Sequence, residues 1–468
     1  MAVTRDDLAF VKSATVTDTD NNGGRKSYIE VPNRTRFNLF PRVTRPERMN
    51  GKTRYRKEFL WNKNAANEVA YGVLVYILYP SPAGDRFYLA EGTQTDIQGD
   101  IDDGYKWCGG GVLHTDITAG ATQISVEFES DDYYIANGMT IAINSHFLVG
   151  QTIMSGVRAF DAVKFDSAQG MWVKESAPDA DSEDVYPYGT YLGNNKVFSY
   201  NDSGELEYLT IANDQYVNEV IGTGDGNTTD FTDTLEHPPI EPNTVTVYYT
   251  ISGATYSGSD DGEGNINGTN ISSGTINYTT GLIHLTFTTA PDSGTQITCD
   301  YTKRAYSWSG YVCTIDLAEP IANDYLASNT YVGFCIPIGD IKPSHSNIVV
   351  NSANGTFNHS LMTEDNQGTV EDDWTITFTS ATEFTCSGAN EGSIGTGNIT
   401  SSFSPINSNT GQPYFTIPPS AWGGAWAPGD NITFKTHPAA APLWWKEVVP
   451  AGIGPYSDNG VMLEVYVE

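Results

Sequence analysis

Short runs of Val, Ile, Thr, Tyr and Phe, separated by Gly, Asn and Asp, recur along most of the chain. Such runs are typical of β-strands, because β-branched and aromatic side chains pack well on a pleated surface. At 123–129 and 375–379 the residues alternate with period two, which indicates strands with one buried and one solvated face. We expect strands at 71–79, 122–128, 139–143, 244–251, 374–378, 431–434 and 461–467.

Helical patterning is scarce. The best candidate is 4–14, where Thr4 would cap the helix and Asp6 and Asp7 would favour its positive end. Many short strands with closely spaced turn signals favour β-sandwiches or barrels over parallel α/β layers. The sequence therefore predicts an all-β protein of several β-sandwich or barrel-like domains, with little helix.

The length of 468 residues suggests about three domains of roughly 150 residues each. The segment 218–304 looks self-contained, and 274–290 within it carries a hairpin signal around Thr279-Thr280-Gly281. The expected organisation is a basic N-terminal arm at 1–64, a β domain at 65–217, an inserted module at 218–304 and a C-terminal β domain at 305–468.

Charge is distributed unevenly along the chain. The formal net charge is −32, yet residues 1–63 hold 14 Lys and Arg against seven Asp and Glu. The remaining residues hold 11 Lys and Arg against 50 Asp and Glu. Because Pro32, Pro41 and Pro46 interrupt the basic segment, we interpret it as an extended arm and not as a basic helix.

The basic arm has three possible partners: nucleic acid, an acidic protein surface, or the acidic body of its own chain. Nucleic acid ranks last, because the acidic body would repel a phosphate backbone at short range. Each copy carries both signs of charge, so docking within the chain or between copies is favoured. The residues expected to make assembly contacts are Arg34, Arg36, Arg42, Arg45, Arg54, Arg56 and Lys57.

Asp18, Asp20 and Asn22, followed by Gly23, match the first half of a calcium-binding loop, with oxygen ligands on alternate residues. Position twelve of such a loop needs a bidentate Glu, and Ile29 stands there. An ordinary polar turn at the two glycines is therefore the favoured interpretation, and a metal site remains a weaker alternative.

Trp422 and Trp426, with Gly-Gly-Ala between them, are a candidate platform for stacking a sugar ring. The competing interpretation is that these rings fill a β core or an interface between copies, where Trp is enriched. We favour the second, while polysaccharide stays a possible partner.

No catalytic constellation stands out. The seven His residues are isolated, and the chain has no Gly-x-Ser-x-Gly, HExxH or phosphate-binding loop. Five scattered cysteines, none spaced as CxxC, suggest buried free thiols made in a reducing cytosol. The start has no apolar signal region, and no run approaches the roughly 20 apolar residues of a membrane span. We therefore expect no enzyme, no cofactor and no membrane span.

Residues in the self-contained segment carry a resemblance. They are Gly222-Thr-Gly-Asp-Gly226, Phe231, Tyr278-Thr-Thr-Gly281, Ile283, His284, Leu285 and Cys299-Asp-Tyr301. Together they resemble a small β-sandwich module that recurs as an insertion in structural proteins of tailed bacteriophages, especially tail and baseplate components. More weakly, 53–80 is similar to a phage structural pattern, and 413–452 resembles the C-terminal region of proteins of Mu-like phages.

This resemblance implies a structural component of a tailed-phage virion, made in the host cytoplasm, at the baseplate or neck. Its expected partners are copies of itself and other virion proteins, and it supplies no catalytic residues. The alternatives are a receptor- or polysaccharide-binding adhesin and a capsid decoration protein.

Overall fold

The computed structural model describes residues 3–32, 37–79, 81, 84–145, 204–454 and 461–467, with short strands between 147 and 200. Antiparallel sheet makes up nearly all of the regular structure, which confirms the all-β prediction. In this described part, α1 (Arg45–Asn50) is the one α-helix, and η1 (Arg5–Asp7), η2 (Gln98–Asp100), η3 (His359–Leu361) and η4 (Pro419–Ala421) are 3-10 turns. None of the helices described is both long and apolar enough to cross a bilayer.

A central body of three sheets surrounds one hydrophobic core, to which Leu60, Val75 and Val126 belong. The five-stranded sheet, of order β2-β1-β3-β36-β5, comprises β1 (Leu8–Thr15), β2 (Gly23–Glu30), β3 (Lys52–Asn62), β5 (Arg86–Glu91) and β36 (Ala440–Val449). The seven-stranded sheet, of order β16-β8-β27-β6-β7-β26-β25, comprises β6 (Gly110–Leu113), β7 (Gln123–Glu127), β8 (Thr140–Asn144), β16 (Leu206–Thr210), β25 (Tyr306–Ser309), β26 (Val312–Asp316) and β27 (Tyr331–Phe334). The third sheet, of order β28-β4-β37, comprises β4 (Ala70–Tyr79), β28 (Ile336–Ile341) and β37 (Met462–Tyr466).

Further short strands lie between the central strands β8 and β16 in the chain. They are β9 (Phe147–Leu148), β10 (Ala162–Asp166), β11 (Met171–Glu175), β12 (Val185–Tyr186), β13 (Tyr191–Leu192), β14 (Lys196–Val197) and β15 (Ser199–Tyr200).

Residues 215–302 form a β-sandwich, here the β17–β24 sandwich, with a hydrophobic core of its own. Its strands are β17 (Gln215–Thr223), β18 (Asp230–Thr234), β19 (Thr246–Ile251), β20 (Ala254–Asp260), β21 (Ile266–Gly268), β22 (Ile271–Ile276), β23 (Leu282–Phe287) and β24 (Gln296–Thr302). One sheet has the order β17-β24-β19-β20-β21 and the other β18-β23-β22. Asn277 Oδ1 accepts hydrogen bonds from the backbone N–H groups of Thr279 and Thr280 between β22 and β23, and Gly281 follows with φ +74°. This Asx turn fixes the hairpin.

Residues 344–437 form a second β-sandwich, here the β29–β35 sandwich, with a third core. Its strands are β29 (Ser344–Asn351), β30 (Gly355–Phe357), β31 (Asp372–Phe378), β32 (Glu383–Gly388), β33 (Gly392–Asn398), β34 (Trp422–Gly424) and β35 (Asn431–His437). One sheet has the order β29-β35-β31-β32-β33, and β30 pairs with β34.

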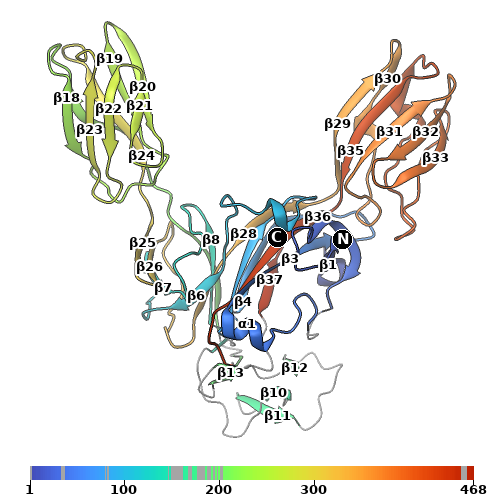
Figure 1. Ribbon diagram of the computed structural model, residues 1–468, viewed down its shortest axis with the longest axis horizontal. Coiled ribbons are helices and arrows are strands. Elements are labelled where there is room, and N and C mark those ends of the chain that lie inside the picture. The colour runs from blue at the N-terminus through green and yellow to red at the C-terminus, as the bar shows by residue number, and fades with distance from the viewer. Residues whose placement is uncertain are drawn as a thin grey trace.

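Figure 1 shows the two sandwiches standing apart from each other on one side of the central body. Each leaves and rejoins that body at neighbouring points. The backbone N–H of Lys303 donates to Asp214 O at 2.9 Å, and Ser344 pairs with His437 in the β29–β35 ladder. Both sandwiches are therefore insertions whose ends lie side by side.

Three expectations about the chain differ from the structure. The helix expected at 4–14 is wrong: Thr4 and Asp7 do form a capping box, but it closes only η1, and Leu8–Thr15 is a strand. That strand lies between β2 and β3, so two sheet partners and the burial of Val11 replace helical hydrogen bonds. The segment expected as an arm at 1–64 contributes three strands to the central body. The stretch 305–468 is divided between two units, because β36 and β37 return to the central sheets.

All five cysteines are free and buried. Burial raises the pKa of the Cys108, Cys313 and Cys386 thiols to about 12, so these thiols stay protonated and unreactive at neutral pH. They act as small core side chains.

Candidate functional site

Three of the basic residues expected to make assembly contacts lie on β3, inside the central body. Arg54 donates from Nε to Glu447 Oε2 at 2.6 Å, Arg56 pairs with Asp18, and Lys57 Nζ lies 2.6 Å from Asp96 Oδ1. Arg54 and Arg56 are each 3% exposed and Lys57 is 0% exposed. These cations pair with carboxylates of their own chain. Of the three partners considered for the basic segment, this arrangement agrees with the acidic body of the same chain. The three cations are not free to clamp a neighbouring copy.

The other expected contacts lie before β3. Arg42 and Arg45 are exposed, and Arg45 opens α1 after Thr44, whose backbone N–H donates to Glu47 Oε2 at 2.6 Å. Arg34 and Arg36 lie outside the described residues. The accessible positive charge of this segment is therefore concentrated near α1.

The candidate calcium loop forms a polar turn in which the side chains of Asn22 and Asp18 already have protein partners. Asn22 is 0% exposed; its amide donates to Tyr55 O at 3.0 Å and to Gln98 Oε1 at 3.2 Å. Asp18 is the partner of Arg56, at 2.6 Å, and Asp20 is exposed. No set of three or more His, Cys, Asp or Glu side chains suited to a metal occurs among the described residues.

The candidate sugar platform belongs to the core of the β29–β35 sandwich. Trp426 is 4% exposed and stacks on Phe378 with ring centroids 4.2 Å apart. Trp422 is partly buried against the same core and meets Phe384 at 5.1 Å. Trp426 thus fills a core, which is the interpretation favoured above, and Trp422 packs against the same core with partial exposure.

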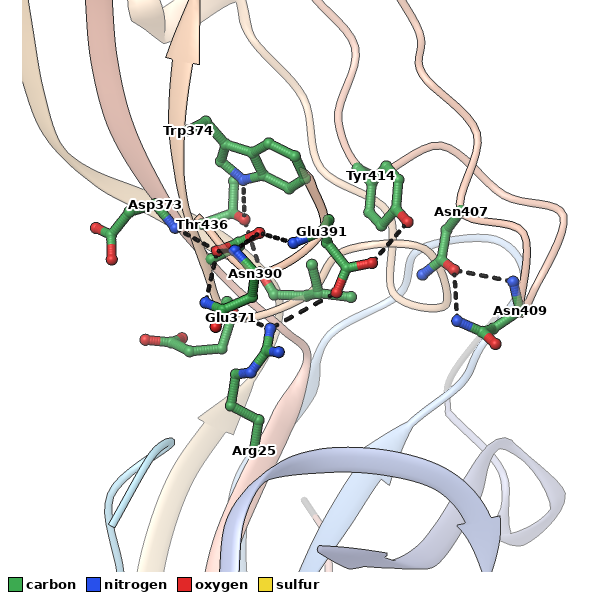
Figure 2. A network of polar contacts seen from close by, with 12 residues as sticks. Arg25, Glu371, Asp373, Trp374, Asn390, Glu391, Asn407, Asn409, Tyr414 and Thr436 are labelled. Atoms are coloured by element: carbon green, nitrogen blue, oxygen red, sulfur yellow. Dashed lines mark hydrogen bonds and ion pairs between the residues drawn. The ribbon is translucent and has the colours of Figure 1, made fainter. Parts of the chain in front are cut away.

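A polar network joins β2 of the central body to the β29–β35 sandwich (Figure 2). Arg25 Nη1 donates to Glu371 O at 3.1 Å and lies 3.6 Å from Glu391 Oε1. Tyr414 OH donates to the other oxygen of Glu391 at 3.0 Å, and Asn407 Nδ2 donates to Tyr28 OH at 2.6 Å. These bonds tie the loops of the sandwich to one strand of the body.

The network continues into the sandwich and the body. Asp372, 1% exposed, accepts from the backbone N–H groups of Asn390 and Glu391, at 3.0 and 2.9 Å. On the body side, Trp61 Nε1 donates to Asn366 O at 2.8 Å. Lys26 Nζ lies 3.9 Å from the Trp61 ring centroid, and burial lowers its pKa to about 7. Hydrogen bonds among buried and partly buried groups thus connect the sandwich directly to the body.

Both sandwiches are strongly acidic. Residues 215–302 contain eleven Asp and Glu and no Lys or Arg. Residues 344–437 contain eight Asp and Glu and a single cation of this kind, Lys435. The surfaces that project from the body therefore attract cationic partners and repel anionic ones.

One constellation was not found from the sequence. Ser346, Glu371 and His437 are separated by at least 25 residues along the chain, yet their side chains form a hydrogen-bonded line in the β29–β35 sandwich. The alternation in β35 predicts that Lys435 and His437 share the outer face of that strand. No local sequence motif indicates that Ser346 on β29 and Glu371 just before β31 lie beside them.

Comparison with known protein families, with curated proteins and with solved structures gives no match to this chain.

Proposed function

We propose that the chain is a structural component of a tailed-phage virion, at the baseplate or neck, that assembles in repeated copies. The observation that carries this proposal is the architecture of two β-sandwiches with separate cores, both inserted into one central body. Such a chain presents two large surfaces at separate positions, as a subunit with several neighbours requires. The resemblance of 218–304 to an inserted phage module supports the assignment to a virion.

Charge suggests how the copies meet. The sandwiches carry nearly all-acidic charge, whereas Arg42 and Arg45 are exposed cations beside α1. Contacts between copies run from this basic surface to an acidic sandwich, which steers encounter and weakens as salt screens the charges. Arg54, Arg56 and Lys57 have no part in this contact, because they serve the interior of the body.

The junction network supports a subunit that holds a fixed geometry. Arg25, Trp61 and Asn407 connect the β29–β35 sandwich to the body through bonds of 2.6 to 3.1 Å. A ring of repeated copies closes only if each subunit keeps the angle between its contact surfaces. The hydrogen bonds of the junction favour such a fixed angle.

Immunogold labelling of purified phage particles with an antibody against 218–304 tests the proposal. We expect gold at one fixed place, at the neck or the tail tip. Particles without gold, with the protein free in the lysate, would contradict the virion role and favour a secreted adhesin. Gold spread over the head would move the protein to the capsid surface.

The contact between copies has its own test. The double charge reversal Arg42→Glu and Arg45→Glu is expected to abolish self-association in sedimentation at about 0.1 M salt, where the screening length is about 10 Å. Lys342→Glu is the control, since it reverses an exposed cation in the connection between β28 and β29. If the double variant assembles like the control, α1 does not form the contact.

A further inference from the structure

The β29–β35 sandwich holds a serine, a histidine and a carboxylate in one line. Ser346 Oγ lies 2.8 Å from His437 Nε2, and His437 Nδ1 lies 2.8 Å from Glu371 Oε2. We propose that Ser346 is a nucleophile, His437 its general base and Glu371 the positioning acid of a site that hydrolyses carboxylic esters. This activity does not depend on the place of the chain in a particle.

The charged carboxylate of Glu371 fixes the direction of its hydrogen bond with His437. Glu371 has 5% side-chain exposure, and its other oxygen, Oε1, lies 2.8 Å from Lys435 Nζ. Burial by itself raises the pKa of Glu371, but hydrogen bonds from His437 and Lys435 outweigh it and lower the pKa, so the carboxylate is charged. An ionised carboxylate can only accept, so His437 Nδ1 carries the hydrogen. In the neutral form of the imidazole, His437 Nε2 then has the lone pair that accepts the Ser346 hydroxyl proton.

The strand pairing explains why these residues meet. Ser346 pairs with Lys435 and Ser344 pairs with His437, so all four side chains share one face of the sheet. The alternate residues of β35, Phe434 and Thr436, are buried on the opposite face. The outer face therefore presents Ser346 and His437 to solvent, with partial exposure of both.

A β-bulge follows the serine directly. Ser346 pairs with Lys435 and Val349 with Thr433, so β29 has one residue more than β35 across this interval. Asn347 within the bulge has φ +55°, in the left-handed region. A bulge leaves one residue outside the regular ladder, and bulges are enriched beside active sites. The backbone N–H groups of the bulge and the exposed Asn347 amide are the candidate donors to a developing oxyanion.

The reaction balances with the ester and water alone. Ser346 Oγ forms a bond to the carbonyl carbon as its proton moves to His437 Nε2, and the carbonyl oxygen takes the negative charge. The bond to the alcohol oxygen then breaks, and the proton on Nε2 passes to that oxygen. Water attacks the resulting acyl-serine by the same two steps, which releases the carboxylic acid and restores Ser346.

The surroundings favour neutral esters. The sandwich carries eight acidic residues and one Lys, so an anionic substrate would be repelled. Ser346 lies on the outer face of a sheet, so it can reach an acyl group attached to a larger neutral molecule. The substrate class is therefore an ester whose acyl and alcohol parts are both uncharged.

The full chain tests the proposal with a fluorophosphonate probe and with p-nitrophenyl acetate. We expect the probe on Ser346, located by mass spectrometry after chymotryptic digestion. Ser346→Ala and His437→Ala should each lower ester hydrolysis by about 100-fold or more. Ser404→Ala is the matched control, because Ser404 lies in the same sandwich and its Oγ meets Thr416 Oγ1 at 2.9 Å and no histidine. The control should keep the wild-type rate.

Glu371 has a separate readout, since it also pairs with Lys435. Glu371→Gln should lower kcat and leave KM unchanged, because the side chain touches His437 and not the ester. Melting temperatures of all variants establish that they are folded. The proposal is overturned if Ser346 of the folded wild type takes no probe, or if Ser346→Ala hydrolyses the ester as the control does.

Discussion

The pairing of Lys57 with Asp96 provides a direct test of the internal role of β3. Lys57 Nζ lies 2.6 Å from Asp96 Oδ1 and donates to Gly24 O at 2.7 Å and Asp96 O at 3.0 Å. Asp96 Oδ2 accepts from Trp444 Nε1 at 2.8 Å and from Tyr105 OH. Lys57→Met would remove the cation and leave the carboxylate of Asp96 buried without its charge partner.

Removing one partner of a buried ion pair costs about 3–5 kcal/mol. Lys57 is 0% exposed and Asp96 is 7% exposed, so water cannot replace the lost partner. We expect Lys57→Met and Asp96→Asn each to lower the free energy of unfolding of the central body by that amount. The double variant has no buried charge here and should recover about 3 kcal/mol of the summed loss.

Urea unfolding, followed by tryptophan fluorescence at pH 7, measures the stability of the wild type, the two single variants and the double variant, which together form a double-mutant cycle. Lys63→Met is the control, because Lys63 and its partner Glu30 are partly exposed and such pairs contribute below about 1 kcal/mol. Burial raises the pKa of Asp96, but hydrogen bonds from Lys57 and Tyr105 lower it overall. The stabilisation is therefore present above about pH 4 and lost as the pH falls further. Single variants as stable as the control, with additive effects, would refute this reasoning.

Three further predictions concern single features. Burial raises the pKa of Glu58 from 4.5 to about 7, so ionisation of this carboxyl opposes folding above pH 4.5. Glu58→Gln should therefore raise the free energy of unfolding by about 3 kcal/mol at pH 8 and by little at pH 4. Equal gains at the two pH values in urea titrations would contradict this prediction. Trp426→Ala removes a core side chain that stacks on Phe378 and should lower the free energy of unfolding by about 3–5 kcal/mol, seen as a lower melting temperature in thermal unfolding. An unchanged melting temperature would place the ring outside the core. The excised β17–β24 sandwich has its own core and adjacent ends, so it should give a dispersed NMR spectrum and a cooperative melt, whereas a collapsed amide region would show dependence on the body.

The strands were predictable because they are local. Each of the seven expected strand segments overlaps an observed strand; the first, 71–79, overlaps β4, and the last, 461–467, overlaps β37. The turn between β22 and β23 was equally predictable, because Asn277 and Gly281 carry the conformational signal themselves. The helix expected at 4–14 failed because a capping box reports only the first turn. Pairing with β3, which is far along the chain, makes the residues after that turn a strand.

The fate of the β3 cations depended on distant partners. Arg54 meets Glu447, which is 393 residues away, and nothing in the local pattern reveals such a contact. An irregular basic segment with prolines has the same appearance whether it is free or folded inward. Ser346 and His437 were hidden for the same reason, since strand pairing across 91 residues brings them together. The alternation in a sequence predicts on which side of a strand a side chain lies. Only the pairing of strands in the folded sheet shows which side chains lie next to it.

The lack of basic residues in the two sandwiches also bears on their resistance to proteolysis. Neither 197–302 nor 343–434 contains a Lys or Arg. Proteases that cut after basic side chains therefore have no site within the β17–β24 sandwich, and in the β29–β35 sandwich they have only Lys435, which is paired on both sides within its sheet. The two sandwiches that project from the body are thus built to withstand trypsin-like digestion.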